Sequence, residues 1–97
     1  MNNTQEAQER IRKWIEYAED DLILDLGWLN LNELPEIPSN VKILFCDNNL
    51  LTFLPDNLQN LTYLSCSYNQ LTILNNLQNL TYLDCYNNQL TILNNLQ

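Results

Sequence analysis

The stretch Leu61-Thr-Tyr-Leu-Ser-Cys-Ser-Tyr-Asn-Gln-Leu-Thr-Ile-Leu-Asn-Asn-Leu-Gln-Asn79 is followed at once by a near copy, Leu80-Thr-Tyr-Leu-Asp-Cys-Tyr-Asn-Asn-Gln-Leu-Thr-Ile-Leu-Asn-Asn-Leu-Gln97. Each copy carries one cysteine at the same place, Cys66 and Cys85, and Cys46 precedes Cys66 at nearly the same spacing. Both copies follow the template L-x-x-L-x-C-x-x-N-x-L-x-x-L-x-x-L. Self-similarity at such a short, fixed period predicts a chain of stacked, equivalent coils.

The length of the coil predicts its path. A coil as short as this template has room for a short strand and two turns, and the prolines at positions 35, 38 and 55 exclude a helix from the return path. We therefore expect an α/β solenoid: a right-handed superhelix with a parallel concave sheet and an extended convex side. About four coils should fill residues 21–97. The first is degenerate, because Leu29 stands where later coils carry Asn.

Residues 1–20 form a separate predicted unit. They contain an apolar stripe with helical spacing, made of Ala7, Ile11, Trp14, Ile15 and Ala18. Asn3 and Glu6 are spaced as a capping box at the start of such a helix. We expect an amphipathic helix that caps the first coil, as terminal repeats require. A helix that binds a partner is the alternative interpretation.

The pattern resembles a known family of repeats. The template resembles the leucine-rich repeat with Cys in its third apolar position. The phrase Leu31-Asn-Glu-Leu34-Pro35-Glu-Ile37-Pro38 resembles the short repeats of bacterial secreted effectors, and the later coils resemble the cysteine-ladder repeats of some internalin-type proteins. This resemblance covers roughly residues 21–97 and implies a helical cap before them. It implies no ubiquitin-ligase activity, because the catalytic domain of the ligase effectors is missing from the sequence.

Charge restricts the expected partners and compartment. The net charge is −8, and all four cations, Arg10, Arg12, Lys13 and Lys42, precede Ile43. We therefore expect no nucleic-acid or membrane partner. The polar, acidic N-terminus does not resemble a secretory signal, which predicts a cytoplasmic protein. The many asparagines are similar to what AT-rich genomes encode, including those of giant viruses; a viral or effector origin would place the chain in the host cytoplasm.

Catalysis has little support in the sequence. There is no His and only one Gly, so the usual nucleophile, acid–base and phosphate-binding sets cannot be assembled. Three cysteines stacked in line cannot surround a tetrahedral metal ion, whereas Cys packs well as a small hydrophobe. We predict a non-enzymatic protein with no cofactor and no metal, whose thiols are reduced and buried.

The outward positions of the predicted strands are aromatic where a solvated sheet would carry Lys, Glu and Thr. Aromatic residues are enriched at the centres of protein interfaces. We therefore predict a scaffold that binds a partner protein on the concave sheet, through aromatic anchors with two aspartates at the polar margin: Phe45, Asp47, Tyr63, Tyr68, Tyr82, Asp84 and Tyr86. A purely structural role, in which stacked tyrosines shield the sheet, is the alternative.

A rival function is self-association. The fourth coil keeps the interior consensus unchanged, although terminal repeats need a polar outer face. An uncapped coil would form a homodimer through its edge, and the residues expected there are Leu83, Cys85, Leu90, Leu93 and Leu96.

Overall fold

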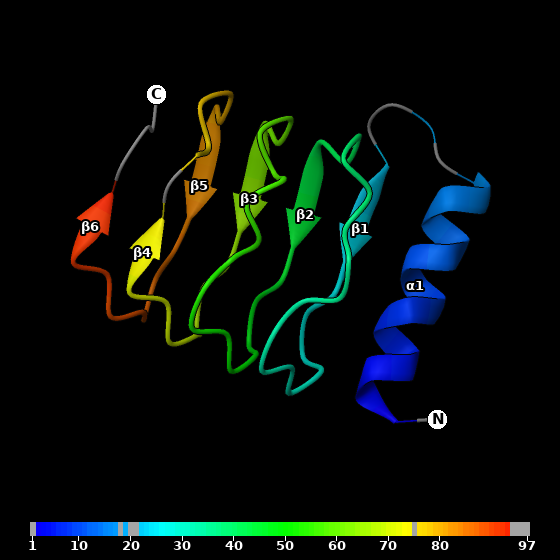
Figure 1. Cartoon of the computed structure of the whole chain (residues 1–97), viewed down its shortest axis with the longest axis horizontal. Helices are drawn as coiled ribbons and strands as arrows, with labels where there is room; N and C mark the ends of the chain where they lie inside the picture. Colours follow the sequence, from blue (N-terminus) through cyan, green and yellow to red (C-terminus); the bar gives the residue numbers. More distant parts are fainter. Residues whose placement is uncertain (1, 18, 20–21, 75, 94–97) are drawn as a thin grey trace.

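The computed structural model describes residues 2–17, 19, 22–74 and 76–93. In this part of the chain, one helix, α1 (Asn3–Tyr17), precedes six short strands (Figure 1). The strands are β1 (Ile23–Asp25), β2 (Ile43–Phe45), β3 (Tyr63–Ser65), β4 (Ile73–Leu74), β5 (Tyr82–Asp84) and β6 (Ile92–Leu93).

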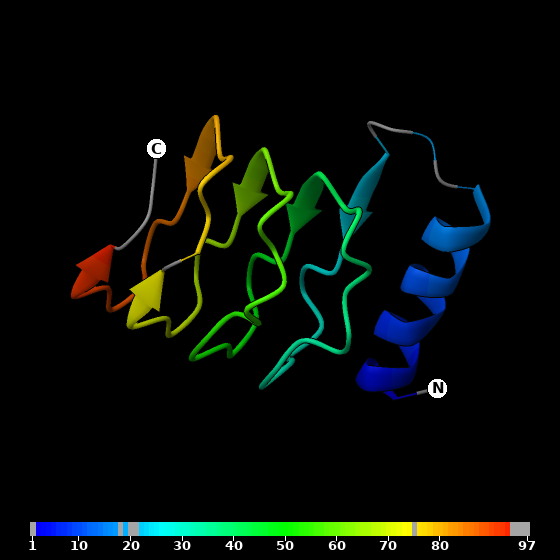
Figure 2. The same cartoon turned by 45° about the horizontal axis from the view of Figure 1, so that its top comes forward.

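Four of the strands form one parallel sheet in the order β1-β2-β3-β5. Its register joins equivalent positions of successive sequence repeats, since Leu24 pairs with Leu44, Leu44 with Leu64, and Leu64 with Leu83. A second, two-stranded parallel sheet, β4-β6, lies apart from the first (Figure 2). The predicted parallel sheet and its single helix are confirmed, and this arrangement is compatible with an α/β fold.

The core is built from the inward positions of the strands and loops. Leu24, Leu44 and Leu64 are almost fully buried at the middle of their strands, while the strand residues on either side of them face outward. Leucines and cysteines that recur at the inward template positions, such as Cys46 and Leu51, are buried with them. The template therefore specifies one continuous apolar layer behind the sheet, because each inward side chain lies next to its equivalent on the neighbouring strand.

Side-chain amides of asparagines at equivalent positions form hydrogen bonds with the backbone N–H and C=O groups behind this layer. The Asn69 side chain is buried; its Oδ1 accepts the Leu51 N–H at 3.1 Å, and its Nδ2 donates to the carbonyls of Cys46 and Cys66 at 3.0 and 3.1 Å. Asn49 makes the same kind of contacts one repeat earlier, and Asn88 one repeat later. These amides hydrogen-bond backbone groups that no strand ladder reaches, so the template requires Asn at this position.

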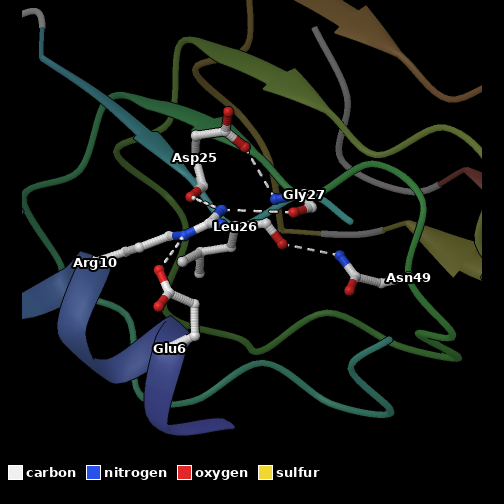
Figure 3. Close-up of polar contacts among 6 residues, drawn as sticks. All are labelled: Glu6, Arg10, Asp25, Leu26, Gly27 and Asn49. Carbon is white, nitrogen blue, oxygen red and sulfur yellow. Dashed lines mark hydrogen bonds and ion pairs between the residues drawn. The ribbon is translucent and has the colours of Figure 1, made fainter. Parts of the chain in front are cut away.

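Helix α1 lies along the free edge of β1 (Figure 1). Arg10 occupies hydrogen-bond acceptors at that edge. Its guanidinium donates to the carbonyls of Asp25 at 3.1 Å and Gly27 at 3.5 Å, and it forms an ion pair with Glu6 at 3.0 Å (Figure 3). The indole N–H of Trp14, which is buried, donates to the Leu22 carbonyl at 3.0 Å. An edge strand covered in this way cannot pair with another chain.

Two details of the predicted helix are wrong. Ile15, which the sequence places on the buried stripe, is 61% exposed, because it lies about 100° around the helix from the buried Trp14, at the margin of the stripe. The capping box forms one residue earlier than predicted, between Asn2 and Gln5, which exchange side-chain and backbone hydrogen bonds of 2.8 and 2.9 Å. The predicted stripe residue Ala18 lies outside the described residues.

Among the residues that the structure describes, no helix has the length and apolar character needed to cross a membrane.

Candidate functional site

The outward side of the β1-β2-β3-β5 sheet, called the sheet face below, carries two columns of side chains. The register places Ile23, Ile43, Tyr63 and Tyr82 in one column and Asp25, Phe45, Ser65 and Asp84 in the other. Equivalent positions of the sequence repeats are therefore aligned across the four strands. The side chains are grouped by type. Aromatic rings lie over β2, β3 and β5, and carboxylates flank them.

The rings form a preassembled row. The ring centroids of Tyr63 and Tyr82 lie 4.2 Å apart with an interplanar angle of 9°, a stacked pair. Phe45 adjoins Tyr63, with centroids 5.6 Å apart and an angle of 35°. Loss of hydration at this face raises the pKa of Tyr63, and a hydrogen bond with Tyr82 and the nearby aspartates raise it further.

A hydrogen-bonded network of aspartates and serines borders the rings. Asp47 Oδ1 accepts the Ser65 hydroxyl at 2.7 Å and the Ser67 N–H at 2.8 Å. The Ser67 hydroxyl donates to Asp84 Oδ1 at 2.6 Å and accepts the Tyr86 N–H at 3.0 Å. Charge-assisted bonds of this length hold the carboxylates in one orientation. The two aspartates are half-buried. They therefore hold neighbouring residues of the sheet face in place and also give the face negative charge.

Sequence reasoning missed Ser65 and Ser67 as members of the site. Both are buried, and each donates its hydroxyl to an Asp of a neighbouring repeat, Ser65 to Asp47 and Ser67 to Asp84. The signal was present in the aligned repeats, where Ser65 stands next to Asp84 and Ser67 next to Asp47 at equivalent positions. A hydroxyl can donate to a carboxylate where a second carboxylate could only repel it.

The predicted anchors differ in how far they are exposed. Tyr82, Tyr68 and Tyr86 are exposed, whereas Phe45 and Tyr63 are half-buried within the row. The structure brings Phe45, Tyr63 and Tyr82 into contact with one another, but it records no ring pair that includes Tyr68 or Tyr86 among the described residues. These two rings therefore stand apart, in the turns that follow β3 and β5.

The three thiols are free, and two of them belong to the core. Cys46 and Cys66 are fully buried, and burial raises the pKa of both thiols. Cys85 is only half-buried, so the prediction that all three are buried fails in part, because β5 is paired on one side alone within the described chain. No group of three Cys, Asp or Glu side chains in the described ranges is placed to hold a metal ion.

The residues expected to support self-association lie at the β5 end of the molecule. Leu83, Cys85 and Leu90 are half-buried and pack against the core, whereas their equivalents one repeat earlier are fully buried. A shallow hollow of about 320 Å³ lies at this end, lined by residues 82–86. The side chain of Leu93 and the whole of Leu96 lie outside the described residues.

Comparison of the chain with models of protein families, with curated proteins and with solved structures finds no match. What the site does has to be inferred from its own residues.

Proposed function

We propose that the chain is a leucine-rich-repeat solenoid capped by α1, and that it acts as a non-catalytic scaffold that binds a partner protein on its concave sheet. The repeat template and the in-register pairing of equivalent positions support the solenoid. The free thiols are in keeping with a reducing compartment, so the proposed setting is the cytoplasm. Neither nucleic acid nor membrane is a proposed partner, because no cation follows Lys42.

One observation carries the binding proposal: the row of rings formed by Phe45, Tyr63 and Tyr82 on the sheet face. Stacked rings are already ordered, so they lose little conformational entropy when a partner covers them. Tyrosine offers a large apolar area together with a hydroxyl, which suits a surface that is hydrated when free and covered when bound. The flanking aspartates disfavour acidic partners and attract basic ones.

Catalysis is not part of the proposal. The raised pKa values of Cys46 and Cys66 keep these thiols protonated, and a buried thiol is neither an accessible nor an activated nucleophile. The chain contains no His that could act as their base.

The test is a selection of binding peptides from a random displayed library on the immobilised protein, followed by affinity measurement against variants. Replacing Tyr63 and Tyr82 together by Ser should lower the affinity of the selected peptides for the protein by about tenfold or more. Aromatic residues at the centre of an interface typically contribute more than about 1 kcal/mol each to binding. Phe53→Ser is the matched control, since Phe53 is 47% exposed, like Tyr82, but lies outside the sheet face.

Peptides that bind the double variant as tightly as the parent protein would refute the assignment of the sheet face. Equal loss in the Phe53→Ser control would point to a general effect of exposed aromatic area. The thermal midpoint of each variant, measured in parallel, separates lost binding from lost folding.

A second candidate, self-association, is favoured by the half-exposed Leu83, Cys85 and Leu90. Their equivalents Leu64, Cys66 and Leu71 are fully buried, so the β5 end leaves apolar surface that the interior repeats cover. A second copy that pairs along β5 would cover this surface, and a homodimer is the simplest such assembly.

A further inference from the structure

The turns that follow the four strands of the main sheet share an unusual backbone conformation. Trp28, Asn48, Tyr68 and Asn87 each lie three residues after a strand, and their φ angles are 62°, 60°, 60° and 55°. This left-handed conformation suits Asn, whose short polar side chain tolerates it. For a bulky residue it is an outlier, because Cβ approaches the following carbonyl oxygen. The same turn is therefore filled by a suitable residue in two repeats and by a strained one in the other two.

Backbone hydrogen bonds to the next repeat hold three of these turns. The N–H of Trp28 donates to the Asp47 carbonyl at 3.0 Å, and the N–H of Tyr68 donates to the Tyr86 carbonyl at 2.7 Å. The turn of Asn48 is held by an equivalent bond to the Ser67 carbonyl at 2.9 Å. The Trp28, Asn48 and Tyr68 turns therefore share both the left-handed φ and the same backbone hydrogen bond to the next repeat. Trp28 and Tyr68 consequently raise the free energy of the folded state relative to Asn at the same positions.

Neither strained side chain contributes visibly to the fold. Trp28 is 78% exposed and Tyr68 is 56% exposed. In the described part of the chain, neither the indole N–H nor the phenol hydroxyl takes part in a hydrogen bond, and neither ring pairs with another. Backbone strain at exposed aromatic residues that do not stabilise the fold is typical of positions that serve binding.

Aspartates lie beside these turns, since Asp25 precedes Trp28 by three residues and the Asp47 carbonyl accepts the Trp28 N–H. Exposed Tyr86 lies in the neighbouring turn, directly before Asn87, and the three turn aromatics Trp28, Tyr68 and Tyr86 are called the aromatic rim below. The hydrogen bonds of Asp25, Asp47 and Asp84 all end on Oδ1, which leaves the Oδ2 atoms, as far as the described residues go, open to a partner.

The nearest cation does not neutralise this surface. The Arg10 guanidinium is already engaged by Glu6 and by the backbone carbonyls of Asp25 and Gly27 (Figure 3). No Lys or Arg follows Lys42 in the sequence. The aromatic rim therefore combines unoccupied π faces with uncompensated carboxylates, which is the chemistry that recognises a cation.

We propose that the aromatic rim binds an extended, arginine-bearing segment of the partner protein. Guanidinium groups stack on the rings of Trp28 and Tyr68 and pair with the free oxygens of the neighbouring aspartates. The backbones of these two turns are two strand spacings apart, about 10 Å, and a polyproline II segment places the side chains of residues i and i+3 on the same side at about 9 Å. The preferred segment is accordingly Arg-x-x-Arg. This inference rests on the proposed scaffold function and names the class of partner.

The probe is the capped hexapeptide Gly-Arg-Gly-Gly-Arg-Gly, titrated at physiological salt into the full chain and followed by NMR shifts of the exposed indole and ring protons. Control peptides carry Glu in place of Arg, or two adjacent Arg residues. The main variant replaces both strained residues, Trp28→Asn with Tyr68→Asn. Trp28→Tyr is the conservative variant, because it keeps both a ring and the strained φ.

The proposal predicts two effects of opposite sign in the double variant. The thermal midpoint rises, by about 5 °C or more, because two strained residues are replaced by one that tolerates the turn. The affinity for the Arg-x-x-Arg peptide falls by about tenfold or more, because both stacking faces are lost. Trp28→Tyr keeps most of the affinity and the parent midpoint.

Three results would overturn the proposal. A lower midpoint in the double variant would show that the rings support the fold. Equal affinity of the Arg and Glu peptides, or no binding of the Arg peptide, would remove the cationic partner. Loss of peptide binding in Tyr63→Ser with Tyr82→Ser, but not in the double Asn variant, would move the site onto the sheet face and leave the scaffold function intact. Failure of the library selection on the sheet face would refute that function separately.

Discussion

Replacing the buried Asn69 by Ala tests the physical basis of the repeat directly. The side chain accepts the Leu51 N–H at 3.1 Å and donates to the Cys46, Cys66 and Ser67 carbonyls at 3.0, 3.1 and 3.3 Å. Both cysteine carbonyls also accept from the asparagine of a neighbouring repeat, so they keep one partner in the variant. The Leu51 N–H lies in the dry core and is left with none from this side chain.

The expected loss follows from these partners. An unpaired buried N–H costs about 1–3 kcal/mol, and each of the lost bonds to the cysteine carbonyls removes about 0.5–1.5 kcal/mol. The sum is about 4 kcal/mol, a large part of the roughly 5–15 kcal/mol that stabilises a domain. Asn88→Ala is the matched comparison, because Asn88 makes the same contacts in a half-buried place where water can replace the amide. It should cost about 1–2 kcal/mol.

Urea unfolding followed by the fluorescence of buried Trp14 and by circular dichroism measures both variants, with the slope m kept as a check on two-state behaviour. Equal losses for Asn69→Ala and Asn88→Ala would refute the reasoning, since burial would then not set the cost. A loss below about 1 kcal/mol for Asn69→Ala would do so as well, because the Leu51 N–H would have to find another partner.

Two further predictions concern the thiols and the assembly state. Burial raises the pKa of the Cys46 and Cys66 thiols, so their contribution is fully present below the unfolded-state pKa of about 8.5 and is lost as the pH rises above it. Stability should fall by about 2 kcal/mol per thiol between pH 8 and pH 10 in urea unfolding, and a Cys46→Ala, Cys66→Ala variant should lose this slope. If self-association through the β5 end occurs, sedimentation at high micromolar concentration should show a dimer that Leu90→Glu dissociates. A strictly monomeric parent protein would exclude that candidate.

Much of the fold could be predicted because the repeat constrains the same positions several times. The Leu and Cys positions of the template specify inward side chains, and their regular spacing sets the register that joins Leu24, Leu44, Leu64 and Leu83. The parallel sheet, its outward columns and the inward asparagines follow from this spacing alone. One error lies outside the repeat, in α1, where Ile15 fits the helical stripe but is exposed. Another lies in the last described repeat, where Cys85 is only half-buried because β5 is paired on one side alone among the described strands.

The properties of the site depended on contacts between repeats, which no single repeat encodes. That Asp47 is held by Ser65 and Ser67 depends on which side chains the register brings together across strands. The left-handed φ of Trp28 and Tyr68 occurs together with hydrogen bonds to the next repeat, and residue type alone argues against it. The sequence by itself determined the parallel sheet and its inward leucines, because each repeat of the sequence contains apolar residues that have to be buried. Only the tertiary structure decided which aromatic rings are stacked, which are strained and which carboxylate oxygens stay free, because those properties belong to pairs of repeats.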